Sequence, residues 1–278
     1  MSVFGVDYAW GRPGAAALEK AGVKFVCRYL SHDTTGKNLT RAEAEQLSGA
    51  GLSLVVVWET SASRALSGRT GGVADAQDAA KQARGCGMPS DRPIYFAVDF
   101  DADSGQQATI NAYLDGAASV LGRGRVGLYA GYGPIKRAFD AKKITYGWQT
   151  YAWSGGKWDS RAQLQQYSND HTINGVGVDY DRAVKDDFGQ WKVGGGGKPS
   201  KAPKWPGRYL TQPPVMHGDD VRTWQTQMRK RGWRVNVDGA YGPSSESVCR
   251  AFQEEKGLGA DGIVGPATWR AAWEAPVS

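Results

Sequence analysis

The sequence predicts an α/β protein: an irregular TIM-like barrel of five β–α units plus three strands, joined to a small C-terminal three-helix domain. Short apolar runs alternate with helix-like segments over residues 3–142, and further short runs then follow without helices between them. A Gly- and Pro-rich stretch next separates a segment that contains an internal repeat. The alternative, an open doubly wound sheet, is disfavoured because no Gly-rich phosphate loop follows any predicted strand.

The predicted strands are short and largely apolar. Residues 54–58 (LVVVW) have no polar face, which is typical of a parallel strand that is covered on both sides. Eight strands are expected, at residues 3–7, 24–29, 54–58, 94–103, 126–130, 147–152, 162–167 and 176–179.

The predicted helices are recognised by their ends. Pro13 stands in the first turn of one helix and Gly22 lies past its end. Thr40 followed by Glu43 has the form of a capping box, and Ser104 is the expected N-cap of a long helix. Five helices are expected in the barrel, at residues 13–22, 40–51, 73–83, 104–121 and 133–142.

A domain boundary follows the last predicted strands. The stretch GGGGKPSKAPKWPG has no apolar periodicity, and its composition is that of a flexible tether that stiffens toward its prolines. We therefore place the barrel at residues 1–192, a flexible linker at 193–207 and the small domain at 208–278.

Composition narrows the class of protein. With 41% hydrophobic residues, 11 Trp and 12 Tyr, the chain is globular, and it has no apolar stretch long enough to insert into a membrane. The N-terminus lacks a basic segment followed by an apolar run, so no secretory signal is expected. Cys27, Cys86 and Cys249 are scattered and are expected to be reduced core residues.

The charge of the chain predicts a polyanionic partner, which is nucleic acid, an anionic membrane or an anionic cell-wall polymer. The formal net charge is +6, and residues 194–278 carry 12 Lys and Arg against 8 Asp and Glu. Nucleic acid is disfavoured as that partner, because no groove-reading motif accompanies the charge. His32, His171 and His217 lie far apart without metal-ligand spacing, so neither a metal nor a cofactor is expected.

Acidic residues terminate several predicted strands. In a β–α barrel these ends surround one mouth, where the chemistry takes place. Asp99 and Asp101, in IYFAVDFDAD, are expected on one face of their strand, and two such close carboxylates raise the proton affinity of one member. The other acidic strand ends are Asp7, Glu59, Asp179 and Asp181.

Aromatic residues occupy or follow the remaining strand ends, at Tyr129, Tyr151, Trp153 and Tyr167. Carboxylates interleaved with Tyr and Trp are typical of a sugar-binding cleft, because aromatic faces stack on sugars and carboxylates bind hydroxyl groups. Trp58 and Trp148 are expected in the core instead. The predicted substrate-binding residues are Arg28, Tyr129, Trp153, Tyr167 and Asp181.

Residues 1–190 resemble the glycoside-hydrolase-like barrels related to the family-25 muramidases, and most closely a branch with a domain of unknown function. The stretches that carry this resemblance are GVDYAW, KFVCRYLS, AVDFDAD, VGLYAGYG, WQTYAW, LQQYS and GVDYD. The resemblance implies a barrel of five β–α units plus three strands and cleavage of the β-1,4 bond between N-acetylmuramic acid and N-acetylglucosamine. It also implies that Asp7, Asp99 and Asp179 are active-site residues.

Asp101 stands where the muramidases have a glutamate acid, and aspartate is one methylene shorter. Three hypotheses are open. In the first the backbone compensates for the shorter side chain and Asp101 is the acid; in the second Glu59 supplies the acid; in the third the barrel binds glycan without cutting it. In the first hypothesis Asp99 stabilises the charge that develops on the sugar, while Asp7 and Asp179 position sugar and water and raise the proton affinity of Asp101.

The segment after the linker repeats a turn. VDGAYGP at 237–243 and ADGIVGP at 260–266 each place a tight turn before a proline that starts a helix. The segment resembles the three-helix peptidoglycan-binding module of cell-wall hydrolases, although Trp224-Gln225 replaces the usual Leu-Gln. Trp224, Trp269 and Trp273 are expected in its core. The predicted wall-binding residues are Asp238, Tyr241 and Asp261.

These observations predict a monomeric peptidoglycan hydrolase that cleaves the glycan strand of the bacterial cell wall by carboxylate acid–base catalysis. The missing signal fits a phage endolysin, made in the host cytoplasm and acting at the wall. A zinc peptidase or a Cys–His peptidase is disfavoured by the scattered histidines and by the mid-strand position of Cys27. The alternative is a catalytically silent protein that binds cell-wall glycan.

Overall fold

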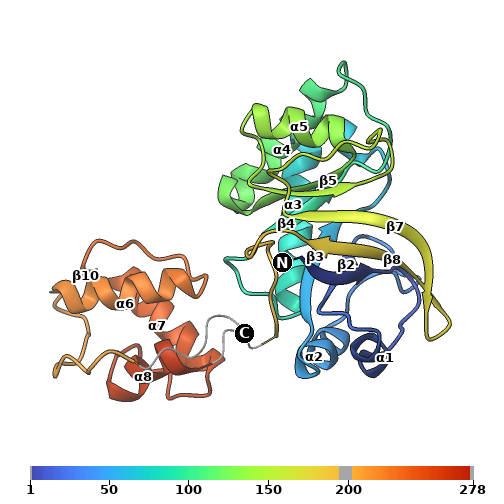
Figure 1. The fold of residues 1–278 in the computed structure, drawn as a ribbon. Coiled ribbons are helices and arrows are strands. Elements are labelled where there is room, and N and C mark those ends of the chain that lie inside the picture. The colour runs from blue at the N-terminus through green and yellow to red at the C-terminus, as the bar shows by residue number, and fades with distance from the viewer. Residues whose placement is uncertain (1, 194–201, 276–278) are drawn as a thin grey trace. The chain divides into compact units, whose positions relative to one another are not determined.

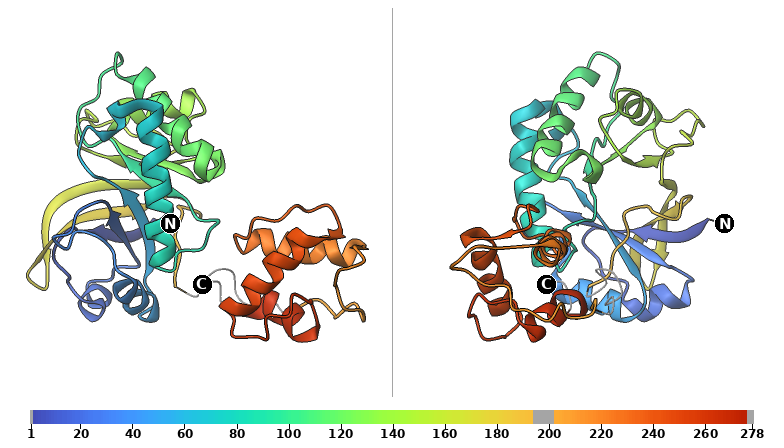
Figure 2. Two further views of the ribbon diagram at one scale, coloured as in Figure 1. Left: turned by 180° about the vertical axis from the view of Figure 1, so that it is seen from behind. Right: turned by 90° about the vertical axis from the view of Figure 1, so that its left-hand side faces the viewer.

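The protein is described by a computed structural model that covers residues 2–193 and 202–275. These residues form two compact units, whose described parts are residues 2–88 with 92–193, and residues 89–91 with 202–275. Eight strands of the first unit form a closed barrel in the order β1 to β8, and helices flank it (Figures 1 and 2). The second unit is largely helical, so the predicted fold class is confirmed.

Seven strands of the barrel are parallel and the eighth runs in the opposite direction. The strands are β1 (Val3–Asp7), β2 (Phe25–Leu30), β3 (Ser53–Trp58), β4 (Ile94–Ala97), β5 (Val126–Ala130), β6 (Tyr146–Thr150), β7 (Leu164–Ile173) and β8 (Val176–Ala183).

Two strands are longer than the sequence predicts and one is shorter. β7 and β8 form a hairpin in which Ile173 pairs with Val176 across the two-residue turn Asn174-Gly175, both at positive φ. An Asn-Gly turn of this kind matches the twist of antiparallel strands, so this dipeptide is a hairpin signal that the predicted strand bounds do not include. β4 ends at Ala97, so the alternation expected over 94–103 stops before Asp99.

Five helices and two short 3-10 turns complete the first unit. The helices are α1 (Ala15–Lys20), α2 (Arg41–Gly49), α3 (Gly68–Gly85), α4 (Gln107–Leu121) and α5 (Tyr132–Asp140), and the turns are η1 (Arg64–Ser67) and η2 (Arg123–Arg125). The N-cap Thr40 accepts a hydrogen bond from the backbone N–H of Glu43, as its sequence predicts.

The core of this unit has two layers. Residues that point into the barrel, such as Phe25, Val57 and Trp148, form one cluster, and outward residues such as Val56 and Trp58 pack against the helices. Both tryptophans are 1% exposed, as predicted for core residues. The two layers follow from strand geometry, because neighbouring side chains point to opposite faces.

The second unit contains β9 (Met216–His217), α6 (Asp219–Lys230), β10 (Ala240–Tyr241), α7 (Pro243–Glu255) and α8 (Pro266–Glu274). The turn repeat of the sequence is a repeat of structure. Gln225 Nε2 donates to Asp238 Oδ1, Ala240 O and Ser245 Oγ, and its Oε1 accepts from the N–H of Gly239. The side chain of Gln225 thereby provides hydrogen-bond partners for polar groups of the turn at 238–240, which the backbone of α6 does not bond.

Gln253 makes the same four bonds one repeat later, to Asp261, Ile263 O, Thr268 and the N–H of Gly262. Trp224 and Trp269 lie in the core of the unit as predicted, and Trp273 packs against it partly buried.

The predicted linker 193–207 extends too far. Residues 194–201 lie outside the described part of the chain, but Ala202 and Trp205 pack against the core of the second unit. Gly and Pro content alone does not distinguish a flexible tether from a packed segment, and here the apolar ring of Trp205 fixes the segment to the core.

The three cysteines are buried and free. Among the described residues no helix is both long and apolar enough to cross a membrane. The same residues contain no cluster of three or more His, Cys, Asp or Glu side chains that could hold a metal ion.

Candidate active site

The candidate site lies at the mouth of the barrel where β1 to β7 end. Asp7 is the last residue of β1, and Glu59 directly follows β3. Asp179 and Asp181 were expected to end the eighth strand, but β8 runs in the opposite direction and continues to Ala183. Because Asp179 pairs in register with Asp7, it nevertheless lies at the same end of the barrel.

Two carboxyl groups, of Asp7 and Asp181, lie side by side inside the barrel. Asp7 is 2% exposed and Asp181 is fully buried. Tyr29 donates to Asp7 Oδ1 at 3.0 Å, and Trp148 Nε1 donates to Asp181 Oδ1 at 2.8 Å. Asp181 Oδ2 receives no N–H or O–H from the described residues. A proton on Asp181 that is donated to Asp7 satisfies this oxygen and removes one of two adjacent charges.

Burial raises the pKa of both carboxyl groups. The pKa of Asp7 rises to about 7, because burial and the charge of Asp179 outweigh the hydrogen bonds from Gln166, Asp181 and Tyr29. The pKa of Asp181 rises well above its ordinary value because of burial and the neighbouring Asp7. The pair therefore holds a proton near neutral pH.

Gln166 connects this buried pair to the mouth. Its Oε1 accepts from the hydroxyl of Tyr129 at 2.9 Å. Its Nε2 donates to Asp7 Oδ2 at 2.8 Å and, more weakly, to Asp179 Oδ2 at 3.4 Å. Gln166 was not among the predicted site residues, although its position two residues after the inward Leu164 of β7 indicates an inward side chain.

Three partly buried carboxylates lie above the pair. Glu59 is held in an ion pair with Lys37, with 2.5 Å between Lys37 Nζ and Glu59 Oε1. Burial raises the pKa of Asp99, and the charges of Glu59 and Asp179 raise it further. The pKa of Asp179 is also raised by burial, although the backbone N–H of Asp170 donates to its Oδ1. The site thus places Asp99, whose pKa is raised, near Glu59, whose carboxylate is paired with the ammonium group of Lys37.

Lys37 is a second residue that the sequence analysis missed. Its ammonium lies 4.5 Å from the ring centroid of Tyr29 and 5.7 Å from that of Trp10. Trp10 follows β1 and is 61% exposed. Lys37 therefore joins the carboxylates to an exposed aromatic side chain at the rim.

Asp101 does not share a strand face with Asp99 as expected. The chain leaves the sheet at Ala97, and Asp101 is exposed. No hydrogen bond or ion pair joins its carboxylate to another described residue. The expected shared face of Asp99 and Asp101 is wrong, because strand alternation does not apply beyond the end of β4.

Two predicted substrate-binding residues lie outside the barrel mouth. Arg28 is fully buried on the outer side of β2, where its Nε donates to Glu43 of α2 at 2.8 Å. Tyr167 contacts Tyr180 and the guanidinium of Arg182 on the outer face of the last strands. Both assignments are corrected, because neighbouring residues of a strand point to opposite faces.

The remaining predicted aromatics lie near the mouth. Tyr129 is inside the barrel and bonds Gln166. Trp153 and Tyr151 follow β6 and are each 45% exposed. The backbone N–H of Tyr151 donates to the carbonyl of Gln166, which anchors this segment to β7.

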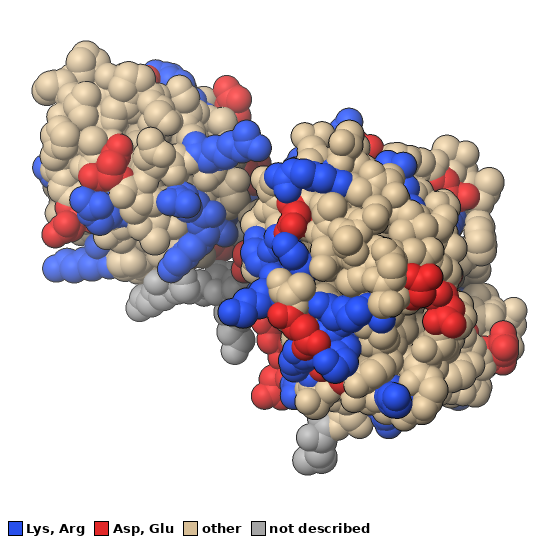
Figure 3. Space-filling view, turned by 90° about the horizontal axis from the view of Figure 1, so that it is seen from above, with Lys and Arg blue, Asp and Glu red and all other residues tan. Residues whose placement is uncertain are grey.

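The predicted wall-binding residues form part of the turn repeat. Tyr241 is fully buried and donates its hydroxyl hydrogen to Gly262 O, so its assignment as a ligand-contacting residue is wrong. Asp238 and Asp261 are exposed, but each carboxylate accepts from the glutamine of its repeat and from a backbone N–H two residues on. The basic side chains visible on each unit in Figure 3 are interspersed with acidic ones.

Comparison with known proteins identifies a family for each of the two units. Residues 16–184 match the family model "Rv2525c-like, glycoside hydrolase-like domain", and residues 217–272 match "Putative peptidoglycan binding domain". The chain is 32% identical over 199 residues to the Mycobacterium tuberculosis protein described as "Putative peptidoglycan hydrolase Rv2525c", covering 67% of this chain and 82% of the relative.

Solved structures show the same relationship. The crystal structure of the M. tuberculosis Tat-secreted protein Rv2525c with L-tartrate superposes with a TM-score of 0.65 at 32% identity, over 68% of this chain and 98% of the other. The autolysin LytC of Streptococcus pneumoniae matches in fold alone, with a TM-score of 0.50 at 14% identity over 65% of this chain and 46% of LytC.

These relatives change one expectation and establish the family. The expected synthesis in a host cytoplasm without an export signal is wrong by this comparison, because the relative that matches the barrel unit is described as Tat-secreted. The match of the family model to residues 16–184 covers more than half of the chain. The chain therefore belongs to the Rv2525c-like, glycoside hydrolase-like domain family.

Proposed function

We propose that the protein hydrolyses the glycan strand of bacterial peptidoglycan by carboxylate acid–base catalysis, as a muramidase does. One observation carries the proposal: at the barrel mouth Asp99, with a raised pKa, lies beside Glu59, which is paired with Lys37. Hydrolysis of an acetal needs a carboxylic acid that protonates the leaving oxygen and a carboxylate that stabilises the positive charge on the sugar.

Asp99 is the acid in this proposal. It is partly exposed and therefore accessible to substrate, and burial together with Glu59 favours its protonated form. It gives its proton to the glycosidic oxygen as the bond to the anomeric carbon breaks. Glu59, paired with Lys37, stabilises the cation, and water then adds to the anomeric carbon while Asp179 accepts its proton.

The buried pair acts beneath these groups. Asp7 reaches Asp179 through Gln166, so the position of the Asp179 carboxylate depends on the charge state of the pair. Asp7 and Asp181 are positioning residues in this scheme, since neither is accessible to substrate. Trp10, Tyr151 and Trp153 supply exposed aromatic faces for the sugar rings.

The second unit is proposed to hold the enzyme on the wall. Its match to a peptidoglycan-binding domain supports this role. Binding of the same polymer by both units raises the local substrate concentration at the barrel without new contacts there. A phage origin stays a prediction.

The test compares three aspartates that lie close together in the chain. Purified peptidoglycan is incubated with the full chain and new reducing ends are counted. Asp99→Asn is expected to lower the rate by about 10²–10⁴-fold, the usual contribution of a general acid. Asp103→Asn is the matched control, because its carboxylate accepts from the backbone N–H of Gln106 before α4 and has no part in the proposed chemistry.

Asp101→Asn distinguishes the alternatives. If it abolishes cleavage while Asp99→Asn does not, Asp101 is the acid and the assignment to Asp99 fails. If the unsubstituted chain sediments with the walls but releases no reducing ends, the protein is a silent glycan-binding protein and the hydrolase proposal fails.

A further inference from the structure

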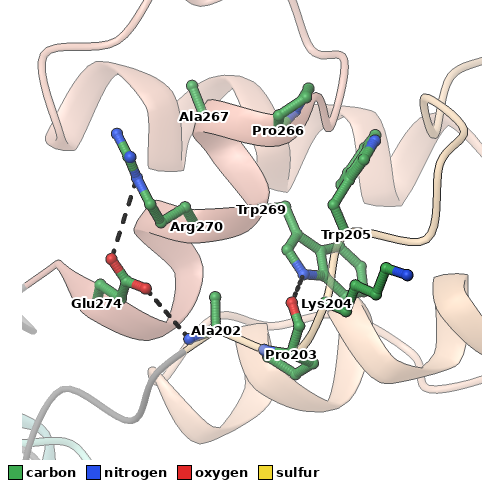
Figure 4. Close-up of a pocket in the computed structure, with 9 residues that line it drawn as sticks. All are labelled: Ala202, Pro203, Lys204, Trp205, Pro266, Ala267, Trp269, Arg270 and Glu274. Carbon is green, nitrogen blue, oxygen red and sulfur yellow. Dashed lines mark hydrogen bonds and ion pairs between the residues drawn. The ribbon is translucent and has the colours of Figure 1, made fainter.

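We propose that a pocket of the second unit binds the acidic muropeptide of peptidoglycan, meaning N-acetylmuramic acid with its stem peptide. The pocket has a volume of about 440 Å³ and lies between residues 202–205 and α8. Figure 4 shows Lys204 and Trp205 on one side and Arg270 and Glu274 on the other. This inference rests on peptidoglycan being the polymer that the protein recognises.

The segment 202–205 is fixed to α8 by directional contacts. Trp269 Nε1 donates to Pro203 O at 2.9 Å, and the backbone N–H of Ala202 donates to Glu274 Oε1 at 3.2 Å. The ring of Trp205 packs edge-on against that of Trp269, with 5.7 Å between the centroids. The wall of the pocket is therefore built before a ligand arrives, which lowers the entropic cost of binding.

Five of the nine residues that line this pocket lie outside the matched domain. The peptidoglycan-binding match covers residues 217–272, whereas Lys204 and Trp205 precede it and Glu274 follows it. The chain segment before the module thus completes a site that the module alone lacks.

The pocket combines an aromatic wall with excess positive charge. Its aromatic wall consists of Trp205, which is partly exposed, and Trp269, which lies in the core of the unit. The side chain of Arg270 is 72% exposed, and Glu274 is 4.0 Å away at the limit of an ion pair. Lys204 is exposed and pairs with no described residue. The pocket lining therefore carries two cationic side chains against one carboxylate, and that carboxylate already accepts from a backbone N–H.

This chemistry selects among the parts of peptidoglycan. A neutral N-acetylglucosamine unit would use the aromatic wall but not the cations. A muropeptide offers an apolar sugar face together with the carboxylates of its peptide, and so uses both. The volume is within the range of small-molecule sites.

The experiment measures binding of N-acetylmuramoyl-L-alanyl-D-isoglutamine to the full chain by calorimetry. Its uncharged amide, with the peptide carboxylate blocked, is the matched ligand. We expect the acid to bind at least tenfold more tightly than the amide, and this preference to shrink as salt is raised. The double variant Lys204→Gln/Arg270→Gln should abolish the preference for the acid. Trp205→Ala should lower the affinity for both ligands about tenfold.

Arg229→Gln is the matched control, since Arg229 is an exposed arginine of α6 that does not line the pocket. Equal affinity of the full chain for acid and amide overturns the proposal. An unchanged preference for the acid in the Lys204→Gln/Arg270→Gln double variant overturns it too, because these substitutions leave the core intact. Release of reducing ends from soluble glycan fragments is measured on the same samples. Activity without pocket-dependent binding refutes this inference alone, whereas pocket-dependent binding without activity refutes the hydrolase proposal alone.

Discussion

The buried Asp7–Asp181 pair makes the stability of the protein depend on pH, and Asp7→Asn exposes this dependence. The native pKa of Asp7 is about 7, against an ordinary value of 3.8. Between these values the native state keeps a proton that the unfolded chain has released. The free energy of unfolding therefore falls as pH rises through this window.

The size of the effect follows from the shift. About three pKa units at 1.36 kcal/mol each correspond to about 4 kcal/mol, of which about 2.5 kcal/mol is lost between pH 5 and pH 8. An asparagine at position 7 does not titrate. Its altered hydrogen bonds to Tyr29 and Gln166 have a cost that is the same at every pH in this range.

The assay is urea denaturation of the full chain at pH 5, 6, 7 and 8. The unfolding free energy of Asp7→Asn, minus that of the unsubstituted protein, should rise by about 2.5 kcal/mol from pH 5 to pH 8. Asp159→Asn is the control. Its hydrogen bonds with Arg161 lower the pKa of Asp159, so its contribution is present throughout this range and its difference should stay constant. A difference for Asp7→Asn that is flat or falls with pH would refute the shared-proton account.

Two further predictions concern packing and the turn repeat. A Cβ at Gly72 in α3 would lie 1.9 Å from the carbonyl oxygen of Tyr113 in α4, so Gly72→Ala should lower the unfolding free energy by about 1–3 kcal/mol. In the control Gly85→Ala a Cβ meets nothing within 4 Å, so this variant should be neutral or more stable by up to about 1 kcal/mol. Equal melting temperatures for the two variants would contradict this prediction. Gln225→Ala and Gln253→Ala should each destabilise the second unit by about 1–3 kcal/mol, because each removes the same four hydrogen bonds; calorimetry that shows one of them silent would refute the equivalence of the repeats.

The barrel could be predicted because its signals are local. Apolar runs, capping residues and the change to strands without intervening helices can each be recognised from residues that are close in sequence. The fold class follows from these signals. The missed hairpin at Asn174-Gly175 was equally local, and the error lay in ending both strands too early. The shared face expected for Asp99 and Asp101 was wrong because β4 ends at Ala97, and the N–H of Asp99 donates to Ala62 O, which lies outside the strands.

The candidate site divides along the same line. Asp7, Glu59 and Asp179 were expected at one end because the topology of a β–α barrel brings strand ends together. The buried partnership of Asp7 with Asp181 was not, because it depends on the register of β1 against the antiparallel β8. Strand alternation would have placed Arg28 correctly. Cys27 and Tyr29 on either side of it belong to the inner layer, so the side chain of Arg28 points outward.

By itself the sequence determined the fold class and most of the strands and helices, because these follow from patterns among neighbouring residues; the topology of a β–α barrel then placed Asp7, Glu59 and Asp179 at one end. Only the tertiary structure decided which carboxyl groups share a proton, which is paired with Lys37, and which segment completes the pocket beside α8. The reason is that charge, burial and hydrogen bonding act through distances in space, and residues far apart in the chain acquire those distances only when strand register and packing are set.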